Sequence, residues 1–275
     1  MANAPSTKTG PHTLELDPEL IKEFAEATSD DTPAYLSGSA VPPTLLATLI
    51  YEPQAASMSQ LLDPAILETM VSGVHGQHEL FLHRPLEVGE TLTGYVEAFA
   101  LKPARSNLRV TFRHPAYDQA GELVAEQWWT TVLLGTTAEP EGPDLADYSF
   151  EALDRSTPVA TEAVRIDAAM VQRYADLSKD YSEHHFTLEG AQRSGQPEVF
   201  LHGLCTMALA GRAVVRTVAG GDPRKVRRFA VRFASPAFLD RDLVTSLYPI
   251  SATSFAFDGV CGDAPALRNG YVELD

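Results

Sequence analysis

The sequence predicts an α+β protein built from two tandem units, each with one apolar helix wrapped by an antiparallel sheet. Three observations predict this architecture. The order helix, polar loop, apolar segment, strands occurs twice along the chain. The expected strands alternate apolar and polar residues between Gly, Pro and Asp positions. The apolar helical segments are hydrophobic on nearly every side, so a sheet must cover them.

Composition limits the class of protein. A chain of 275 residues with 44% hydrophobic and 21% charged residues is typical of a globular protein with a substantial core. The formal net charge of -16 argues against nucleic acid as a partner. Two cysteines, Cys205 and Cys261, are too few for a disulfide framework. The first 13 residues lack the apolar core of a signal peptide, and no apolar run reaches a membrane-spanning length of about 18 residues, so we expect a soluble, cytoplasmic protein without membrane contact.

The first unit is expected at residues 1–135. Asp17 followed by Pro18 is a strong helix start, because an acidic cap and a first-turn proline both favour the N-terminus of a helix. A second apolar segment begins near Thr44. Strand patterns then occupy residues 78–101, 108–118 and 121–134.

The second unit is expected at residues 161–275, after an acidic, proline-rich linker at 136–160. Asp167 is a predicted helix cap, and a second apolar helix is predicted to begin at Gly203, directly after His202. Strand patterns follow to the end of the chain.

The repeat is visible at single residues. An offset of 150 places Asp30 on Asp180, and an offset of 151 places Pro85 on Pro236. The first unit has Tyr35 where the second has His185. Only the second unit therefore retains both a carboxylate and an imidazole in this loop.

The polar loop of the second unit holds the parts of a proton-transfer site. Asp180 and His185 lie five residues apart, and either group can act as an acid or a base. The Gly203 N–H, at a helix N-terminus, is a donor suited to a developing oxyanion. His184, His185 and His202 are also possible metal ligands. Adjacent histidines rarely point to one centre, so we expect no metal.

Three segments carry a family resemblance: Asp180 to His185, His202-Gly203-Leu-Cys-Thr, and Arg232-Phe-Ala-Ser-Pro236. Together they resemble the MaoC-like, (R)-specific enoyl-CoA hydratases (hydratase 2). The duplicated order is similar to the double-hotdog type, which implies two tandem hotdog units. The family motif has Asn where this chain has Ser182.

The resemblance implies reversible hydration of trans-2-enoyl-CoA to (3R)-3-hydroxyacyl-CoA, with the coenzyme A thioester as substrate and no cofactor. It implies catalytic roles for Asp180, His185 and Gly203. It also implies a first unit that gave up its own site to make room for the acyl tail, and a possible homodimer. The positions expected to contact substrate are His75, Gly76, Ser182, Arg232 and Phe233, with Phe24, Leu45, Leu46 and Leu49 as candidates for lining the acyl space.

A basic run at residues 224–228 stands out in this acidic chain. Arg227 and Arg228 are either part of a solvated loop and strand edge or a binding site for coenzyme A phosphates. Two other functions stay open. One is a dehydratase acting on acyl-carrier-protein thioesters in fatty-acid or polyketide synthesis, and the other is a non-catalytic acyl-thioester-binding subunit.

Overall fold

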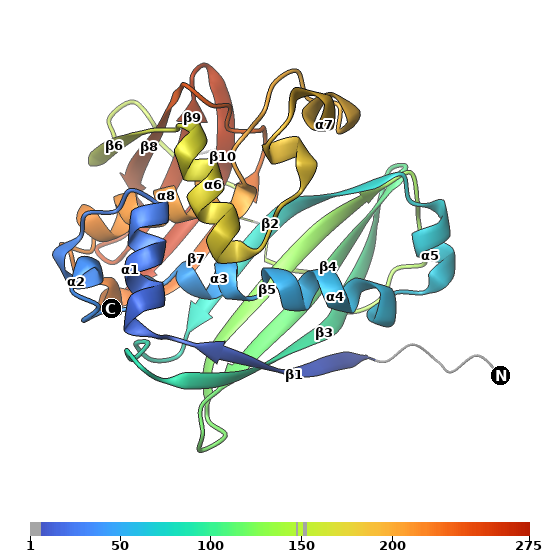
Figure 1. The fold of residues 1–275 in the computed structure, drawn as a ribbon, viewed down its shortest axis with the longest axis horizontal. Coiled ribbons are helices and arrows are strands. Elements are labelled where there is room, and N and C mark those ends of the chain that lie inside the picture. The colour runs from blue at the N-terminus through green and yellow to red at the C-terminus, as the bar shows by residue number, and fades with distance from the viewer. Residues whose placement is uncertain (1–6, 147, 151–152) are drawn as a thin grey trace.

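A ten-stranded antiparallel sheet forms the frame of the protein in the computed structural model, which describes residues 7–146, 148–150 and 153–275 (Figure 1). The strand order is β1-β3-β4-β5-β2-β7-β10-β9-β8-β6. The predicted first unit also includes residues 1–6, and the predicted linker includes residues 147 and 151–152. These positions lie outside the described residues.

The sheet divides into two halves that match the repeat. The two halves join where β2 pairs with β7, and Glu79 stands opposite Ala230 in that pair. These residues are separated by the 151-residue offset of the repeat, so a pseudo-twofold axis passes through them. The strands are β1 (Lys8–Glu15), β2 (Ser72–Leu82), β3 (Thr91–Ala104), β4 (Asn107–Tyr117) and β5 (Leu123–Leu134), then β6 (Ala160–Arg165), β7 (Val226–Phe233), β8 (Asp242–Pro249), β9 (Ser254–Cys261) and β10 (Ala264–Leu274).

The apolar helix of the second unit begins at the predicted residue. It is α8 (Gly203–Arg216), and 11 of its residues are buried. It packs against β7, β8 and β10, which wrap around it. The predicted cap of the preceding helix is also confirmed, because the Asp167 carboxylate accepts a hydrogen bond from the Met170 N–H at 2.7 Å. The other helices of this unit are α6 (Ala168–Ser178), α7 (Leu188–Arg193) and the short 3-10 helices η1 (Glu183–His185) and η2 (Pro223–Lys225).

The corresponding apolar segment of the first unit is split into two helices. One helix ends at Leu49 and the next begins at Tyr51. Pro53 has no N–H to donate to the Leu49 carbonyl, so the helix cannot continue regularly through this point. The second part, α4, contacts β1 and β3. The helices of this unit are α1 (Pro18–Ala27), α2 (Pro33–Leu36), α3 (Leu45–Leu49), α4 (Tyr51–Leu61) and α5 (Pro64–Thr69).

The two units share one apolar core. The largest cluster of buried side chains includes Leu45 and Leu46 of α3 together with Met207 and Val214 of α8. Between the units, Thr48 of α3 hydrogen-bonds to the Tyr174 hydroxyl of α6 at 2.7 Å. Two helix-and-sheet units with a common core and a continuous sheet form the predicted double hotdog. Among the described residues, no helix is both long and apolar enough to cross a bilayer.

Candidate active site

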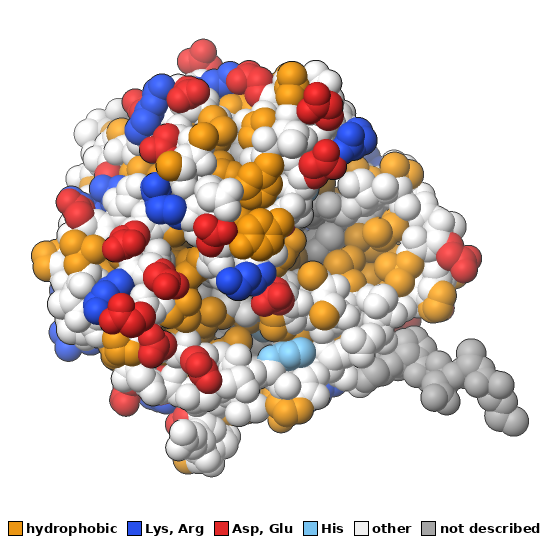
Figure 2. Space-filling view, viewed as in Figure 1, with side chains coloured by type: hydrophobic (Ala, Val, Ile, Leu, Met, Phe, Trp, Pro, Cys, Tyr) orange, Lys and Arg blue, Asp and Glu red, His pale blue; other side chains and the backbone are white. Residues whose placement is uncertain are grey.

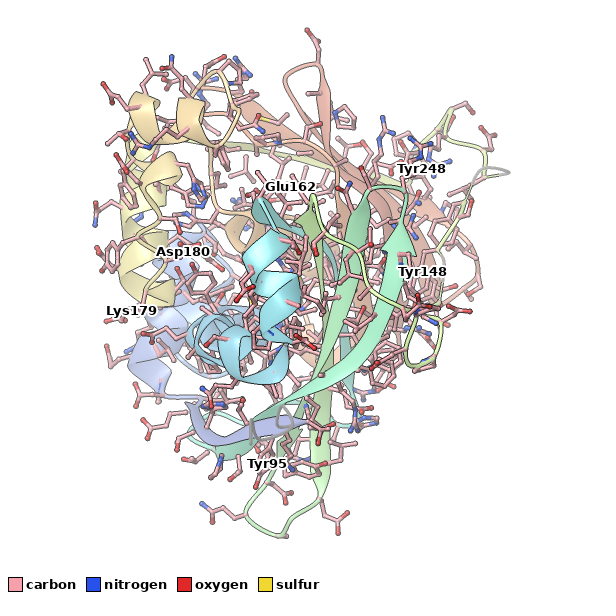
Figure 3. All side chains as sticks on the ribbon, turned by 90° about the vertical axis from the view of Figure 1, so that its right-hand side faces the viewer. Tyr95, Tyr148, Glu162, Lys179, Asp180 and Tyr248 are labelled. Atoms are coloured by element: carbon pink, nitrogen blue, oxygen red, sulfur yellow. The ribbon has the colours of Figure 1, made fainter. Side chains whose placement is uncertain are left out.

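Asp180 lies in a tight turn directly after α6. Lys179 ends that helix in the left-handed conformation, with φ of 62°. The Asp180 carboxylate then accepts hydrogen bonds from the Ser182 N–H at 3.1 Å and from the Ser182 hydroxyl at 2.5 Å. Figure 3 shows Asp180 between the α6 side of the molecule and α4. Ser182, expected to contact substrate, therefore fixes the orientation of the carboxylate.

His185 faces this carboxylate. Its Nε2 lies 3.8 Å from Asp180 Oδ2, and its side chain is only 5% exposed. Its Nδ1 bonds to the Phe200 carbonyl at 2.9 Å, which requires the proton on Nδ1. The neutral ring consequently presents the unprotonated Nε2 toward Asp180. The structure thus brings these two predicted catalytic side chains together.

Both groups are held in their hydrogen-bond-accepting forms. Burial acts to raise the pKa of Asp180, but hydrogen bonds from Ser182 and Tyr51 and the nearby imidazoles outweigh it, so the pKa lies below its usual value. Burial is also the main cause that lowers the pKa of His185, and His202 and His184 add to it. At neutral pH the pair is a carboxylate and a neutral imidazole.

Tyr51 comes from the other unit and was not predicted. It begins α4, and its hydroxyl hydrogen-bonds with the Asp180 carboxylate and with Ser182. Burial is the main cause that raises the pKa of Tyr51 to about 12, so the hydroxyl keeps its proton as a donor. No sequence motif marks Tyr51, because only the fold brings α4 to the loop after α6.

Gly203 stands at the N-terminus of α8, beside this pair. His202 precedes it, and the His202 Nε2–H donates to the Asp180 carbonyl at 2.9 Å instead of capping the helix. The first N–H groups of a helix have no partner within it. Gly203 lines the same cavity as Asp180, and a Cβ added to it would lie 3.5 Å from the Phe233 ring. This helix end is therefore available to an anionic oxygen.

A cavity of about 710 Å³ connects these groups across the two units. The second unit contributes its predicted catalytic and ligand-contacting residues Asp180, Ser182, His185, Gly203 and Phe233. The first unit contributes the predicted His75 and Gly76, and also Tyr51, Gln54, Met58, Met70, Trp129 and Val132, which were not predicted. The expected lining residues Phe24, Leu45, Leu46 and Leu49 do not line it, because they pack into the shared core.

The structure does not bring the predicted arginines to this cavity. Arg227 forms an ion pair with Asp275, and Arg228 forms one with the buried Glu79 of β2. Tyr148 of the linker covers the second pair, since its hydroxyl donates to Glu79 and the Arg228 guanidinium lies over its ring. Arg232 donates to Gln77 at 3.3 Å. None of the three lines the cavity, and their predicted contacts with the substrate, at the coenzyme A phosphates for Arg227 and Arg228, stay predictions.

Within the described part of the chain, one group of three side chains has the ligand types of a metal site. Asp180, His185 and His202 each offer a ligand atom, and these atoms lie within 4.8 Å of one another. Two imidazoles and a carboxylate suit a transition metal. The same residues form the Asp180–His185 pair and its support, and the expected absence of a metal stays a prediction.

Comparison with known proteins gives consistent matches over most of the chain. A family model described as "MaoC like domain" matches residues 150–254, and one described as "FAS1-like, dehydratase domain region" matches residues 3–127. The chain is 31% identical over 202 residues to 3-hydroxyacyl-thioester dehydratase Y of Mycobacterium tuberculosis, covering 70% of this chain and 66% of that protein. It is 27% identical over 197 residues to peroxisomal enoyl-CoA hydratase 2 of Arabidopsis thaliana, covering 68% of this chain and 61% of that protein.

The fold has a close structural counterpart as well. The crystal structure of a MaoC-like dehydratase from Phytophthora capsici superimposes with a TM-score of 0.85 at 21% identity, covering 99% of this chain and 96% of that one. The matched segment spans just under two thirds of the two curated relatives.

Proposed function

The chain belongs to the MaoC-like dehydratase family, and from that premise we propose that it interconverts trans-2-enoyl-CoA and (3R)-3-hydroxyacyl-CoA. The observation that carries the proposal is the convergence of Asp180 Oδ2 and His185 Nε2, 3.8 Å apart, beside the N-terminus of α8 in a cavity large enough for an acyl chain. The proposal makes the protein a hydro-lyase of acyl-CoA metabolism.

In the hydration direction, the pair holds and activates one water molecule. The water donates one hydrogen to Asp180 Oδ2 and the other to His185 Nε2. As its oxygen forms a bond to C3, His185 removes a proton and the C2–C3 π electrons move toward the thioester carbonyl. The imidazolium then returns a proton to C2, which completes the addition of water. Asp180 stabilises the imidazolium between these two steps.

The N-terminus of α8 stabilises the enolate-like oxygen. The thioester oxygen accepts from the Gly203 N–H, where the helix dipole also favours negative charge. A side chain at this position would crowd the approach of that oxygen. One donor of this kind contributes roughly 100- to 1000-fold to the rate of related reactions.

The split helix of the first unit supplies the acyl space. The helical segment is interrupted after α3 and resumes as α4 at Tyr51. The first turns of α4 form one wall of the cavity and do not occupy its interior. Met58 of α4, with Met70 and Val132 from outside this helix, adds apolar surface to the first-unit side of the cavity. An acyl chain attached to the thioester extends along it in this proposal.

Coenzyme A is favoured over an acyl carrier protein as the thiol. An acidic carrier protein needs an extended basic surface for docking, whereas the phosphates of coenzyme A need only a few local cations, and this chain has a net charge of -16. Figure 2 shows Asp and Glu side chains spread across one face, with Lys and Arg side chains among them. A cytoplasmic location and a homodimer stay predictions.

Initial rates with a panel of trans-2-enoyl-CoA substrates test the proposal. We expect hydration to the (3R) product with every chain that fits, and lower rates with the matched carrier-protein thioesters. Dialysis against EDTA should leave the rate unchanged. No hydration across the whole panel, or a (3S) product, would contradict the assignment.

A further inference from the structure

Among the described residues, a single hydrogen bond holds the His185 ring. Its Nδ1–H donates to the Phe200 carbonyl at 2.9 Å, whereas its Nε2 lies 3.8 Å from Asp180 Oδ2, too far for a direct hydrogen bond. One hydrogen bond fixes one atom of the ring and leaves rotation about the N–H···O direction free. Other contacts must therefore keep Nε2 directed toward Asp180.

Three aromatic rings pack against the His185 ring. The His202 ring lies nearest, with centroids 3.8 Å apart and an interplanar angle of 33°. The rings of His184 and Phe200 are steeply inclined to it, at 62° and 73°, with centroids 4.1 and 5.0 Å away. Rings that pack at such different angles restrict rotation of the imidazole in more than one direction.

Phe200 and His184 support each other. Their rings stack with centroids 5.2 Å apart and planes 12° from parallel. The backbone of Phe200 is fixed in turn, because this residue forms an isolated β-bridge with Phe238. The Phe200 ring therefore holds the His184 ring against His185.

The His184 side chain contributes a ring, and it forms no hydrogen bond within the described part of the chain. It is half-buried and lines the cavity, and burial lowers its pKa, so the ring is neutral at pH 7. A neutral ring does not repel the imidazolium that forms on His185 in the proposed reaction. An offset of 150 places Ala34 on His184, so the first unit, which lacks the counterpart of His185, lacks this ring as well.

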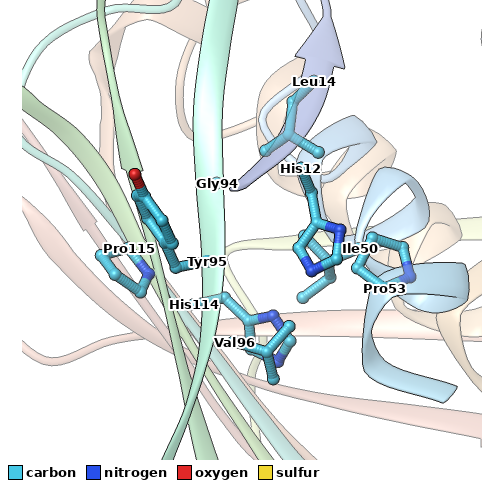
Figure 4. Close-up of a pocket in the computed structure, with 9 residues that line it drawn as sticks. All are labelled: His12, Leu14, Ile50, Pro53, Gly94, Tyr95, Val96, His114 and Pro115. Atoms are coloured by element: carbon cyan, nitrogen blue, oxygen red, sulfur yellow. The ribbon is translucent and has the colours of Figure 1, made fainter. Parts of the chain in front are cut away.

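The buried His114 of the first unit is packed differently. It also hydrogen-bonds to one residue, Gln54, at 2.8 Å. Its ring borders a cavity of about 10 Å³ together with His12 (Figure 4), and the Trp129 ring lies 6.5 Å from it. A buried histidine is therefore accommodated in this protein without close ring contacts, so the three contacts at His185 are not a requirement of burial.

We propose that Phe200 and His184 are positioning residues of the hydration reaction, whose rings keep His185 Nε2 directed toward Asp180. The inference rests on the proposed function, in which the same nitrogen removes a proton from water and returns one to C2. Rotation of the imidazole would move Nε2 away from both positions, and a displacement of about 1 Å can lower a rate by roughly 100-fold. Both residues act through His185.

Leucine substitutions that remove each ring test this. We expect the kcat of enoyl-CoA hydration to fall about 10-fold in Phe200→Leu and by a smaller factor in His184→Leu, with KM within twofold of wild type in both. The double variant should match Phe200→Leu within twofold, because the Phe200 ring holds the His184 ring in place. A rise in KM at unchanged kcat would make the rings part of substrate binding, and that result would overturn the proposal.

Two matched variants separate a ring contact from other causes. His184→Phe keeps a ring and removes the imidazole, so it should retain most of the kcat that His184→Leu loses, whereas a proton-transfer role for His184 would leave both variants equally slow. Phe238→Leu removes a ring from the partner of the same β-bridge, outside the cavity, and should keep kcat within twofold of wild type. A loss in Phe238→Leu equal to that in Phe200→Leu would indicate a general packing defect and contradict the proposal. If Phe200→Leu does not fold, the comparison of His184→Leu with His184→Phe still decides.

Nitrogen-15 NMR of histidine-labelled protein reports the state of His185 independently of turnover. The wild-type His185 ring should show the Nδ1–H tautomer alone. Phe200→Leu should show a mixture of tautomers, because a rotated ring no longer donates to the carbonyl. The His114 signal is the internal reference and should not change. A lower kcat with the pure Nδ1–H tautomer retained would place the effect elsewhere and refute the positioning role.

The two proposals fail in different ways. If the wild-type protein does not hydrate enoyl-CoA, the proposed function fails, while the tautomer signal still tests how His185 is held. If the wild-type protein hydrates the substrate and both leucine variants do so at the same rate, this inference fails and the proposed function stands.

Discussion

The Asp30 turn and the Asp180 turn are nearly the same structure with different surroundings. The Asp30 carboxylate accepts from the Thr32 N–H at 3.0 Å and from the Thr32 hydroxyl at 2.6 Å, as Asp180 does from Ser182. Both turns follow the first helix of their unit. The residue five positions later differs: it is His185 in one unit and Tyr35 in the other, and the buried Tyr35 hydroxyl has no partner in the described residues.

The space beside each turn differs as well. Asp180 opens onto the large cavity, whereas Asp30 does not line it. Near Asp30, the Glu162 carboxylate pairs with Arg212 at 3.1 Å and with Arg216 at 3.2 Å. The comparison shows that the aspartate turn is a structural element of each unit. The proposed hydration requires in addition an imidazole five residues after the aspartate and an open cavity beside the turn.

Replacing the residue five positions after each aspartate, His185 or Tyr35, should give the largest difference in kcat between the two units. His185→Ala removes the base that activates water, so we expect kcat to fall by roughly 1000-fold with enoyl-CoA substrate. Tyr35→Phe removes a buried, unpartnered hydroxyl, so kcat should not change and the free energy of unfolding should rise by ~1 kcal/mol. Steady-state rates and chemical denaturation of both variants check this. Comparable losses of rate in the two variants would refute the assignment of one catalytic unit.

Alanine substitutions at two glycines of α8 should affect different properties, the catalytic rate at Gly203 and the stability at Gly211. In Gly203→Ala the added methyl meets only ordinary contacts with Phe233, so the fold should persist while crowding of the thioester oxygen lowers kcat/KM by roughly 100-fold. In Gly211→Ala the methyl would lie 2.8 Å from Thr44, so we expect a loss of ~1–3 kcal/mol in stability without a site defect. Thermal unfolding and kinetics of the two variants are the measurement. A stability loss without a rate loss in Gly203→Ala would exclude the proposed oxyanion site.

Removal of the Tyr51 hydroxyl, which the first unit contributes to the Asp180 carboxylate, should lower the catalytic rate less. Tyr51→Phe takes one donor from Asp180, so the pKa of Asp180 should rise and kcat/KM should fall by roughly 10-fold. The pH profile distinguishes this from a simple packing defect, because a higher pKa of Asp180 shifts the acid limb of kcat/KM, whereas a packing defect lowers the rate without shifting that limb. Thr48→Ala, which removes a different hydroxyl between the units, is the control and should leave the acid limb unchanged.

Acid should destabilise the protein through the histidines of the first unit. Burial lowers the pKa of His78 to about 4 and that of His114 to about 3. Below pH 6.5 the unfolded chain binds protons that these folded residues do not, so stability present above that pH is lost as the pH falls. Each residue should lower the free energy of unfolding by ~2 kcal/mol between pH 6.5 and 5. Urea unfolding at several pH values checks the slope. His78→Gln should reduce it, and a slope that His78→Gln leaves unaltered would contradict this account.

Much of this architecture could be predicted from local patterns. The caps at Asp17 and Asp167, the strand alternation and the start of α8 at Gly203 depend on neighbours in sequence. The duplicated order predicted the two units. Asp180, His185 and Gly203 could be predicted because they occupy one segment and a recognisable motif.

The rest depends on contacts between distant segments. Tyr51 and Gln54 reach the site only because Pro53 splits the helix and the sheet brings the units together. The charge run around Arg228 suggested a phosphate site, but the Arg228 guanidinium forms an ion pair with Glu79 of the neighbouring strand β2. Charge density along a sequence does not reveal such a partner.

The most direct test of the central claim compares Asp180→Asn with Asp30→Asn in single-turnover hydration of an enoyl-CoA. Both substitutions remove a negative charge from equivalent turns. We predict a loss of roughly 1000-fold or more for Asp180→Asn and a rate within twofold of wild type for folded Asp30→Asn. Full activity in Asp180→Asn, or an equal loss in both variants, would contradict the claim that a single unit carries the chemistry.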